Sequence, residues 1–589
     1  MTDHDGLSQI WNDLVHWISQ DSNVSKNGAG FVHKGLQLRD CPNIGQPLSD
    51  NHLTRTTTTT TTTTHRGVYA TRPIAKGELL IRLPIHRVLD GQSQDSMYPR
   101  PSSPEKNRTD FDQVTKVAVS AWLRCLAAYY RHCQCTEWRP YYQSLPDKYE
   151  TLWQWTHQQQ IDYLAGTSLL ATVIESGPEN NNNNNDDSTF HASKHGANKK
   201  QNELLEQRYW QQVRPYLVHC QLVPTTSMDR TTELQNFQQA CQAISTRCFH
   251  LQAQAGQESE PSCTHHHHHH HPSAVNSNSY TGPFFLPVID LVNHSNEQPS
   301  TTLRRDQSGN FVMTAERDID ANEEVVHSYG ATLTASQCLQ TFGFVPQETM
   351  QYAATRQGIK QDDATQSNYV PPSLTPAMLT NESIVKSCWK VIESDLPETL
   401  ATIMHERHME DESWTVRVDS KRRFDSLPDH LVVSGELSDD LVTLACLPFL
   451  PRCAYAEAIG SRLDQSILQD YYLGKLVGAS LLLAIDSKLR EYIPIPKSRD
   501  WEDLGDCTDD QELLQKLLQS NKNGKMAENA STTRQRMMYG LTVRLEEKAC
   551  LERLRQKVMD LMEGLDDEVD DGLAMVGEEV TTKRQRTAK

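Results

Sequence analysis

The sequence lacks the excess of positive charge that proteins binding nucleic acids usually carry. Its 589 residues include 57 lysines and arginines against 76 aspartates and glutamates, which gives a formal net charge of -19. Binding to a phosphate backbone requires a basic face, so the composition gives no sign of a nucleic-acid partner. An acidic surface suits a soluble protein with a cationic ligand or substrate, although charge alone identifies neither.

Long apolar runs are also missing. The longest run, Leu476 to Ile485, is too short to span a bilayer and predicts a buried helix instead. The opening residues MTDHDGLSQIWNDL have neither the basic start nor the apolar stretch of a secretory signal, and their acids argue against an organellar transit peptide. We therefore expect no membrane association and a cytoplasmic or nuclear location, or both.

Motifs for metals and nucleotides are absent too. The fourteen cysteines are scattered, and the pair Cys133 and Cys135 has no second pair at zinc-ligand spacing, so we expect reduced cysteines and no metal site. The chain has no Walker A loop, HExxH or GxSxG, and no GxGxxG after a strand. The run His265–His271 is better explained as a repeat expansion in a surface loop, because a homopolymer supplies no fixed ligand geometry.

What is present begins with the length, which predicts two or three domains. Three low-complexity segments interrupt the chain: residues 54–64, which include nine consecutive threonines, residues 179–200 with an asparagine run, and residues 252–281 with the histidines. Such segments cannot pack a core, so we predict loops there.

Apolar periodicity places the regular elements of the first half. It predicts an amphipathic helix at Ile10–Ile18 and a strand at Gly30–Leu36. The segment Arg66–Pro84 follows the pattern strand, turn at Lys76-Gly77, strand, and predicts a hairpin. Helical spacing is clearest at Val114–Tyr130. A loop is expected at Thr136–Pro146, and further helices at Tyr163–Ile174, Leu204–Leu217 and Leu234–Leu251.

Helical periodicity dominates from Leu374 to about Met562. Thr508 is expected to cap a helix over Thr508–Leu518, because acids fill its first turn. The helix Arg534–Met562 is expected to bury a row of apolar side chains, namely Leu541, Leu545, Leu554, Val558 and Leu561. The tail 563–589, acidic and then basic, is expected to be disordered.

The stretch Phe284 to Pro346 has the character of a functional site. An apolar run, Phe284–Ile289, predicts a strand that stops at Asp290, with Asn293, His294 and Ser295 just beyond. Rigid strands that end in hydrogen-bonding side chains commonly form binding sites. Two further short pieces follow in the same stretch, Ser328-Tyr329-Gly330 and Phe342-Gly343-Phe344.

Five segments in order resemble the SET-domain methyltransferases: RGVYATRPIAKGELLIRLP, TRCF, DLVNHS, EEVVHSYG and FGFVP. Two more, WRPYYQSLP and RMMYGLTVRLEEKACLERL, are similar to the Rubisco large-subunit methyltransferase-like class. The resemblance implies an α+β protein, in which a β-rich SET domain with a helical insertion precedes an all-α C-terminal domain. The implied boundaries are an N-terminal helix in 1–27, a SET domain in 28–347 with its insert at about 110–240, a helical substrate-binding domain in 370–562 and the tail 563–589.

The resemblance also implies which residues bind the cofactor, S-adenosylmethionine. In such a site, the loop at His65, Arg66, Gly67 and Val68 wraps its methionine end, and Arg247 is suited to its carboxylate. Asp290, Asn293 and His294 hold the cofactor, the last two at the adenine and ribose, and Phe342, Gly343 and Phe344 pack on the adenine. Tyr329 contacts the cofactor and is the implied catalytic residue, with an oxygen that can accept weak C–H hydrogen bonds from the polarised methyl.

The implied activity is protein-lysine N-methylation of a non-histone substrate bound through the C-terminal domain, by a protein expected to be monomeric. The cysteine-rich zinc segments of many histone methyltransferases are missing here. Protein-histidine methylation and a catalytically silent binding protein remain alternatives. The chain departs from the family pattern at His65 and Asn322, where glycine is usual, and at Phe342, where many relatives have tyrosine. Asparagine tolerates the left-handed backbone that the glycine at position 322 would supply.

Overall fold

The structure is a computed structural model that describes eighteen stretches of the chain: residues 3–20, 29–40, 66–90, 139–146, 149–175, 206–207, 209–219, 229–252, 280–295, 297–330, 332–355, 374–393, 430–449, 462–463, 465–469, 471–496, 509–522 and 528–587. The predicted helix Val114–Tyr130 and most of the low-complexity segments lie outside these residues. Among the described residues, no helix combines the length and the apolar character needed to cross a membrane.

The chain divides into two compact units. Unit 1 comprises Met1–Gln158, Ile174–Ser373 and Leu514–Tyr539, and unit 2 comprises Gln159–Val173, Leu374–Leu513 and Gly540–Lys589. Two segments therefore differ from the boundaries expected from the sequence, because Gln159–Val173 belongs to the C-terminal unit and Leu514–Tyr539 to the N-terminal one. Contacts between distant residues cause the exchange, as when Arg536 Nε donates to Glu150 over 2.6 Å.

Unit 1 is built on an eight-stranded sheet in the order β1-β4-β10-β9-β11-β3-β2, with β8 paired to β11 in parallel. A separate sheet has the order β5-β7-β6. The strands of the first sheet are β1 (Phe31–Val32), β2 (Leu36–Asp40), β3 (Arg66–Ala70), β4 (Leu79–Leu83), β8 (Asn293–His294), β9 (Thr301–Arg305), β10 (Phe311–Ala315) and β11 (Glu324–His327). Those of the second are β5 (Leu89–Asp90), β6 (Phe249–Gln252) and β7 (Tyr280–Phe285).

The predicted hairpin within Arg66–Pro84 does not form. β3 pairs with β2 and β11, whereas β4 pairs with β1 and β10. The turn itself is present, with Gly77 at a φ of 85°, but an isolated bridge between Ile74 and Ile319 diverts the chain before β4 begins. The turn at Lys76-Gly77 was therefore predicted correctly, but β3 and β4 pair with strands from distant parts of the sequence and not with each other.

Two other predictions about strands need correction. The single strand expected at Gly30–Leu36 is two strands, β1 and β2, joined by a turn in which Leu36 N donates to His33 O over 3.1 Å. β7 ends at Phe285, so the strand predicted over Phe284–Ile289 does not extend to Asp290. The expectation for Asn322 holds, because its φ is 66°.

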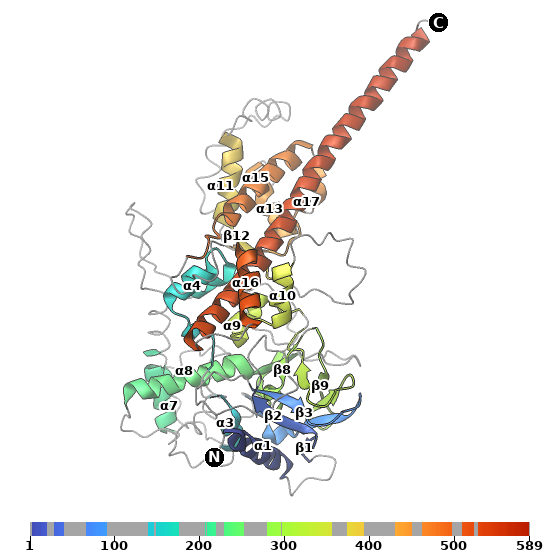
Figure 1. The fold of residues 1–589 in the computed structure, drawn as a ribbon. Coiled ribbons are helices and arrows are strands. Elements are labelled where there is room, and N and C mark those ends of the chain that lie inside the picture. Colours follow the sequence, from blue (N-terminus) through green and yellow to red (C-terminus); the bar gives the residue numbers. More distant parts are fainter. Residues whose placement is uncertain are drawn as a thin grey trace. The chain divides into compact units, whose positions relative to one another are not determined.

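Helix α1 (Asp3–Ser19) lies beside the strands β1 and β2 (Figure 1) and confirms the helix predicted at Ile10–Ile18. Its Trp11 Nε1 donates to Leu36 O over 3.2 Å, which holds α1 against β2. The other helical elements lying wholly within unit 1 are η1 (Ile85–Arg87), α3 (Arg139–Ser144), η2 (Leu152–Gln154), η3 (Tyr209–Val213, a π-helix), α7 (Arg214–His219), α8 (Arg230–Arg247), η4 (Ile289–Leu291), α9 (Ala335–Phe342) and α10 (Gln347–Thr355). α3 stands where a loop was expected, and α8 ends at Arg247, before the predicted Leu251.

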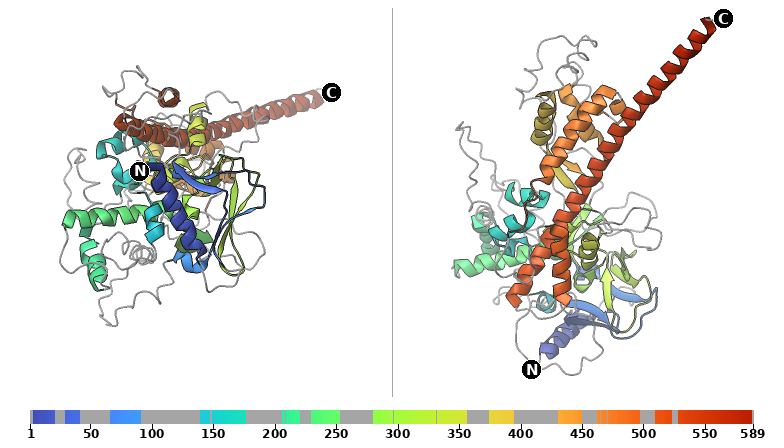
Figure 2. Two further views of the ribbon diagram at one scale, coloured as in Figure 1. Left: turned by 60° about the horizontal axis from the view of Figure 1, so that its bottom comes forward. Right: turned by 45° about the horizontal axis from the view of Figure 1, so that its top comes forward.

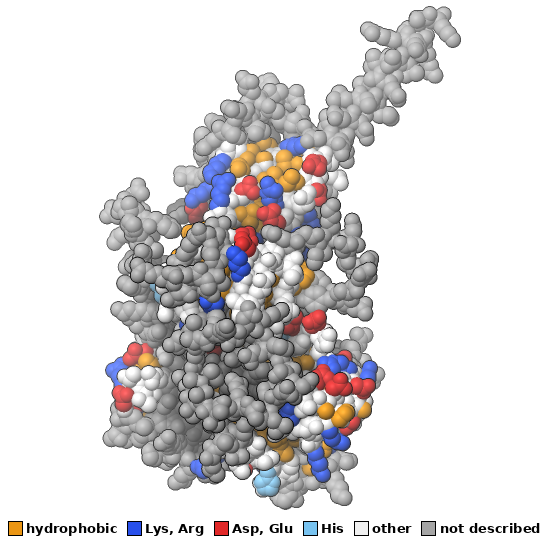
Figure 3. Space-filling view, in the orientation of Figure 1, with side chains coloured by type: hydrophobic (Ala, Val, Ile, Leu, Met, Phe, Trp, Pro, Cys, Tyr) orange, Lys and Arg blue, Asp and Glu red, His pale blue; other side chains and the backbone are white. Residues whose placement is uncertain are grey.

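Unit 2 is mostly helical, with a core formed by α11, α13, α15 and the part of α17 from Gly540 onward. It is not all-α, because β12 and β13 form an antiparallel pair. The elements with residues in unit 2 are α4 (His157–Leu164), α5 (Ser168–Glu175), β12 (Ala377–Thr380), α11 (Asn381–Glu393), β13 (His430–Val433), α13 (Asp439–Cys446), η6 (Leu447–Phe449), η8 (Gln465–Gln469), α15 (Tyr471–Leu489), α16 (Asp510–Lys522) and α17 (Glu528–Thr587). Apolar and charged side chains intermix on the face of α13 and α15 visible in Figure 3.

Helix α17 corrects the expectation of a disordered tail. It continues through the acidic segment to Thr587 and is one uninterrupted helix in both views of Figure 2. No proline occurs between residues 563 and 587 to stop it. The helical region predicted at Tyr163–Ile174 is instead two helices, because Gly166 turns with a φ of 80° where a side chain would meet the backbone of Glu491.

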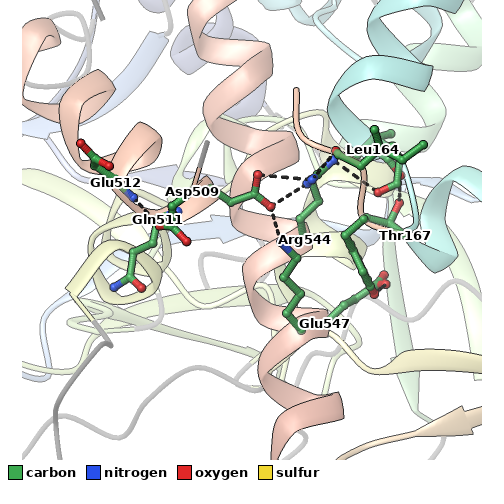
Figure 4. Close-up of polar contacts among 12 residues, drawn as sticks. Leu164, Thr167, Asp509, Gln511, Glu512, Arg544 and Glu547 are labelled. Atoms are coloured by element: carbon green, nitrogen blue, oxygen red, sulfur yellow. Dashed lines mark hydrogen bonds and ion pairs between the residues drawn. The ribbon is translucent and has the colours of Figure 1, made fainter. Parts of the chain in front are cut away.

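The buried face of α17 carries charge as well as apolar side chains. Leu541, Leu554 and Val558 are buried as predicted, but Arg544 is also fully buried. Figure 4 shows Arg544 among its polar contacts. Arg544 pairs with Asp510 at 2.9 Å and donates to Ile493 O over 2.7 Å, while Lys548 reaches the same carboxylate at 2.7 Å.

Two glutamates of α17, Glu546 and Glu547, are also buried close to Arg544 along the helix. Glu547 accepts bonds from Ser168 N at 3.0 Å and from the Tyr492 hydroxyl at 2.8 Å, and burial raises its pKa to about 7. Glu546 accepts bonds from Thr375 N and Oγ1 at 2.9 and 2.6 Å. The residues that satisfy these charges come from segments far away in the sequence.

The start of α16 also differs in detail from the prediction. The Asp509 carboxylate accepts bonds from the amides of Gln511 and Glu512, both at 2.9 Å (Figure 4). Asp509 is therefore the N-cap, and Thr508, the predicted cap, lies outside the described residues.

Candidate active site

The Asp290–His294 segment begins with a strained turn. Val288, fully buried, has a φ of 71°, which is unfavourable for a β-branched residue and typically costs about 1–3 kcal/mol. The turn lets the chain leave β7 and enter η4, which carries Asp290, before β8 presents Asn293 and His294. Backbone strain of this kind is often found where a fold holds functional groups.

Asp290 and Arg247 are brought together, although 43 positions separate them in the sequence. Arg247 Nη1 donates to the Asp290 carbonyl over 2.9 Å and lies 3.7 Å from its carboxylate. The hydroxyl of Tyr141, from α3, donates to the same carboxylate over 2.7 Å. Tyr141 was not among the predicted site residues, because nothing in its local sequence indicates a contact with Asp290.

Asn293 connects three strands of the main sheet. Its Nδ2 donates to Arg66 O of β3 over 3.0 Å and to Glu324 Oε1 of β11 over 2.7 Å. These two bonds fix the orientation of the amide. Glu324 was not among the predicted site residues, and its contact with Asn293 arises from the pairing of β8 with β11.

Tyr329 lies in an aromatic cluster formed by the predicted residues. Its ring centroid is 4.9 Å from that of His294 and 5.0 Å from that of Phe342, and Phe344 lies 6.2 Å from His294. The Tyr329 hydroxyl donates to Val292 O over 2.9 Å, and its amide donates to His294 Nδ1 over 3.0 Å. Burial raises the pKa of Tyr329 far above its usual value, so the phenol stays protonated at neutral pH.

Four predicted residues have structural explanations or lie outside the described part. The side chain of Val68 is buried in the hydrophobic core. Gly343 ends α9 at a φ of 80°, and any side chain there would collide with the backbone of Glu150, so close packing alone requires glycine. His65 lies outside the described residues, whereas Gly67 is paired with Arg39 within β3 and β2.

Several buried polar atoms of the site have no hydrogen-bond partner within the part of the chain that the structure describes. They are Arg247 Nε, Asp290 Oδ1, His294 Nε2 and His327 Nε2. Leaving such an atom unpaired usually costs about 1–3 kcal/mol, so this arrangement is suited to a polar ligand that supplies the missing partners. No group of three or more histidine, cysteine or acidic side chains among the described residues could hold a metal ion.

Residues 65–330 match the family model described as the SET domain. The chain contains a SET domain. This match confirms the predicted SET domain, and it supports a methyltransferase that depends on S-adenosylmethionine. The SET segment includes Arg66, Arg247, Asn293 and Tyr329, while the aromatic pair of Phe342 and Phe344 follows it.

The comparison with solved structures finds distant matches described as Rubisco LSMT bound to AdoMet and as the SET domain of LSMT bound to lysine or to methyllysine with AdoHcy. Each is 12% identical to this chain, with TM-scores of 0.47, 0.47 and 0.48. The alignments cover 95%, 96% and 95% of this chain and 93%, 94% and 93% of those chains. The comparison with curated proteins gives no match, so the family assignment rests on the SET segment.

The pKa of the buried Asp290 carboxyl predicts how the stability of unit 1 changes with pH. Burial raises the pKa of this carboxyl to about 6, although Arg247 and the Tyr141 hydroxyl oppose the change. Its contribution to stability is therefore fully present below about pH 4 and is lost as pH rises through about 6. A difference of about two pKa units corresponds to about 3 kcal/mol.

We expect the wild-type protein to lose up to about 3 kcal/mol relative to Asp290→Asn between about pH 4 and pH 7. Urea denaturation of both proteins across this range measures the difference. Comparing the two proteins cancels the opposite effect of His294, whose pKa burial lowers to about 4 and which destabilises the fold as pH falls. A pH-independent difference would contradict the raised pKa of Asp290.

Proposed function

We propose that this protein is a protein-lysine N-methyltransferase that uses S-adenosylmethionine and modifies a non-histone protein bound through unit 2. The observation that carries the proposal is the convergence of Arg247, Asp290, Asn293 and Tyr329 within the matched SET segment. The WRPYYQSLP and RMMYGLTVRLEEKACLERL segments favour the Rubisco large-subunit methyltransferase-like class. The absence of the cysteine-rich zinc segments that flank the SET domain in many histone methyltransferases favours a non-histone substrate.

The residues of the site fit S-adenosylmethionine. The guanidinium of Arg247, with a buried and unpartnered Nε among the described residues, would bind the cofactor's carboxylate. The amide of Asn293, held in orientation by Arg66 and Glu324, would bind the cofactor beside His294, at the adenine and ribose. Phe342 and Phe344 offer apolar faces to the adenine.

The cofactor supplies a methyl group on a positively charged sulfur, from which a neutral nitrogen can displace it. The chain's part is to exclude water, align the nitrogen and keep the site polar without a competing nucleophile. Alignment is the largest of these contributions, worth about 7 kcal/mol or more in well-oriented systems. Tyr329 suits this role because its hydroxyl is fixed to Val292 O and stays protonated.

A lysine substrate must arrive at the transfer step without its proton. At neutral pH this costs about 4 kcal/mol from a reference pKa near 10.4. The aromatic cluster of His294, Tyr329, Phe342 and Phe344 lowers that cost, because burial beside a cation disfavours a second positive charge.

Calorimetry of S-adenosylmethionine binding to the full chain tests the proposal first. We expect Asn293→Ala to weaken binding by about 10-fold or more, since it removes an oriented polar group that costs about 1.5 kcal/mol to lose. Asn322→Gly is the matched control, because that asparagine is exposed in a turn whose left-handed backbone glycine accepts. Its affinity should equal that of the wild type.

The target residue is tested separately. Tritiated S-adenosylmethionine is incubated with the enzyme and a cell extract, and the labelled protein is analysed by mass spectrometry. A methylated lysine in a non-histone protein is expected. Label on histidine would overturn the choice of lysine, and a wild-type protein that binds no S-adenosylmethionine would overturn the methyltransferase itself.

A further inference from the structure

His327 is a buried imidazole in the site to which the SET resemblance gives no role. It is the last residue of β11, is 6% exposed, and stands two positions before Tyr329. Its ring centroid lies 6.5 Å from that of Tyr329. Its Cα pairs with that of His294 on one side and that of Thr301 on the other, so the sheet fixes its position.

The hydrogen bonds of His327 determine which nitrogen is available. Nδ1 lies 3.2 Å from the carbonyl oxygen of Thr301, and a carbonyl only accepts, so we assign the proton to Nδ1. Nε2 then offers a lone pair and no proton. Burial lowers the pKa of His327, which keeps the ring neutral at neutral pH.

This lone pair is buried and has no partner among the residues that the structure describes. His294, the neighbouring imidazole, has the opposite arrangement. Its Nδ1 accepts from Tyr329 N, so its own buried Nε2 carries the proton and is a donor. Of the two imidazoles beside Tyr329, His327 is therefore the one that presents an acceptor.

The proposed reaction requires the target nitrogen, a hydrogen-bond donor, to enter the site. A neutral amine has two N–H bonds and one lone pair, and only the lone pair attacks the methyl carbon. We infer that His327 Nε2 accepts one N–H of the target nitrogen and thereby turns its lone pair toward the methyl group. The inference rests on the proposed methyl transfer and makes His327 a residue that contacts and orients the substrate.

No covalent bond to His327 is involved in this step. The nitrogen–carbon bond forms from the lone pair of the amine, while the carbon–sulfur bond breaks and the sulfur keeps its electron pair. The nitrogen retains both protons and gains the positive charge that the sulfur loses. His327 releases the product when the methylated nitrogen passes a proton to solvent and leaves.

Replacing His327 tests the assignment. His327→Phe keeps a ring of similar volume but removes the acceptor, and we expect the initial rate of tritium transfer into cell-extract protein to fall about 10-fold to 100-fold. The dissociation constant for S-adenosylmethionine, measured by calorimetry, should stay within about twofold. His327→Gln returns an acceptor oxygen and should restore the rate to within about 10-fold of the wild type.

His33→Phe is the control for losing a buried histidine elsewhere in unit 1. His33 is 8% exposed and contacts Glu78 and Arg72 instead of the site, so its variant should transfer label at the wild-type rate. Wild-type transfer by His327→Phe, with cofactor binding intact, would overturn the inference and leave the proposed function standing. The inference would also be overturned if both His327 variants bound S-adenosylmethionine more weakly at unchanged thermal stability. Nε2 of His327 would then accept a hydrogen bond from the cofactor and not from the substrate.

Discussion

Tyr329→Phe is expected to slow methyl transfer by about 100-fold to 1,000-fold while leaving S-adenosylmethionine binding within about threefold of the wild type. The change removes the hydroxyl that donates to Val292 O and keeps the ring that packs on His294 and Phe342. Removing one oriented polar group that lies next to the atoms whose charge changes in the transition state typically lowers the rate by about 100-fold to 1,000-fold.

The rate is measured as initial incorporation of tritiated methyl into cell-extract protein, and binding is measured by calorimetry on the same preparations. Tyr539→Phe is the matched control. Tyr539 is also buried in unit 1, and its hydroxyl accepts from Gln535 over 2.6 Å, outside the site. Equal labelling by Tyr329→Phe and Tyr539→Phe would mean that Tyr329 is not the catalytic residue.

Arg544→Met is expected to reduce the free energy of unfolding of unit 2 by about 3–5 kcal/mol. Arg544 is fully buried, and its guanidinium satisfies the Asp510 carboxylate and the carbonyl of Ile493 at once. Methionine fills much of the volume but leaves both groups with fewer partners. Lys548 alone would then face Asp510, and its side chain is 29% exposed.

Arg555→Met provides the comparison on the same helix. Arg555 pairs with Asp486 at 3.2 Å, but both side chains are 38% exposed, so its loss should cost less than about 1 kcal/mol. The midpoint of urea unfolding, followed by helical circular dichroism, measures both variants. If the two variants unfold at the same urea concentration, the buried pair contributes no more than a surface pair.

The local sequence of the site was informative because its residues lie close together in short motifs. Asp290, Asn293 and His294 lie within five consecutive positions, and Tyr329 follows by two positions the strand β11 that pairs with Asn293 and His294. The family resemblance added Arg247, and the structure places it against Asp290. These residues could be predicted from the sequence because the family motifs are defined by residue type and by order along the chain.

Other parts of the site depend on strand pairing. Glu324 contacts Asn293, and His327 lies beside His294, only because β8 and β11 run parallel. Tyr141 reaches Asp290 from an element 149 positions earlier. Periodicity indicates which face of an element is buried and does not identify the element that covers it.

By itself, the sequence determined the α+β class, the helix at the start and the presence of a SET domain, and it predicted which residues form the central site. Tertiary structure alone decided that β3 and β4 take separate partners, that Gln159–Val173 belongs to unit 2, and that α17 buries Arg544, Glu546 and Glu547. The reason is physical: a buried charge or an open strand edge is stable only with a partner. Here those partners come from distant parts of the chain, which local patterns do not encode.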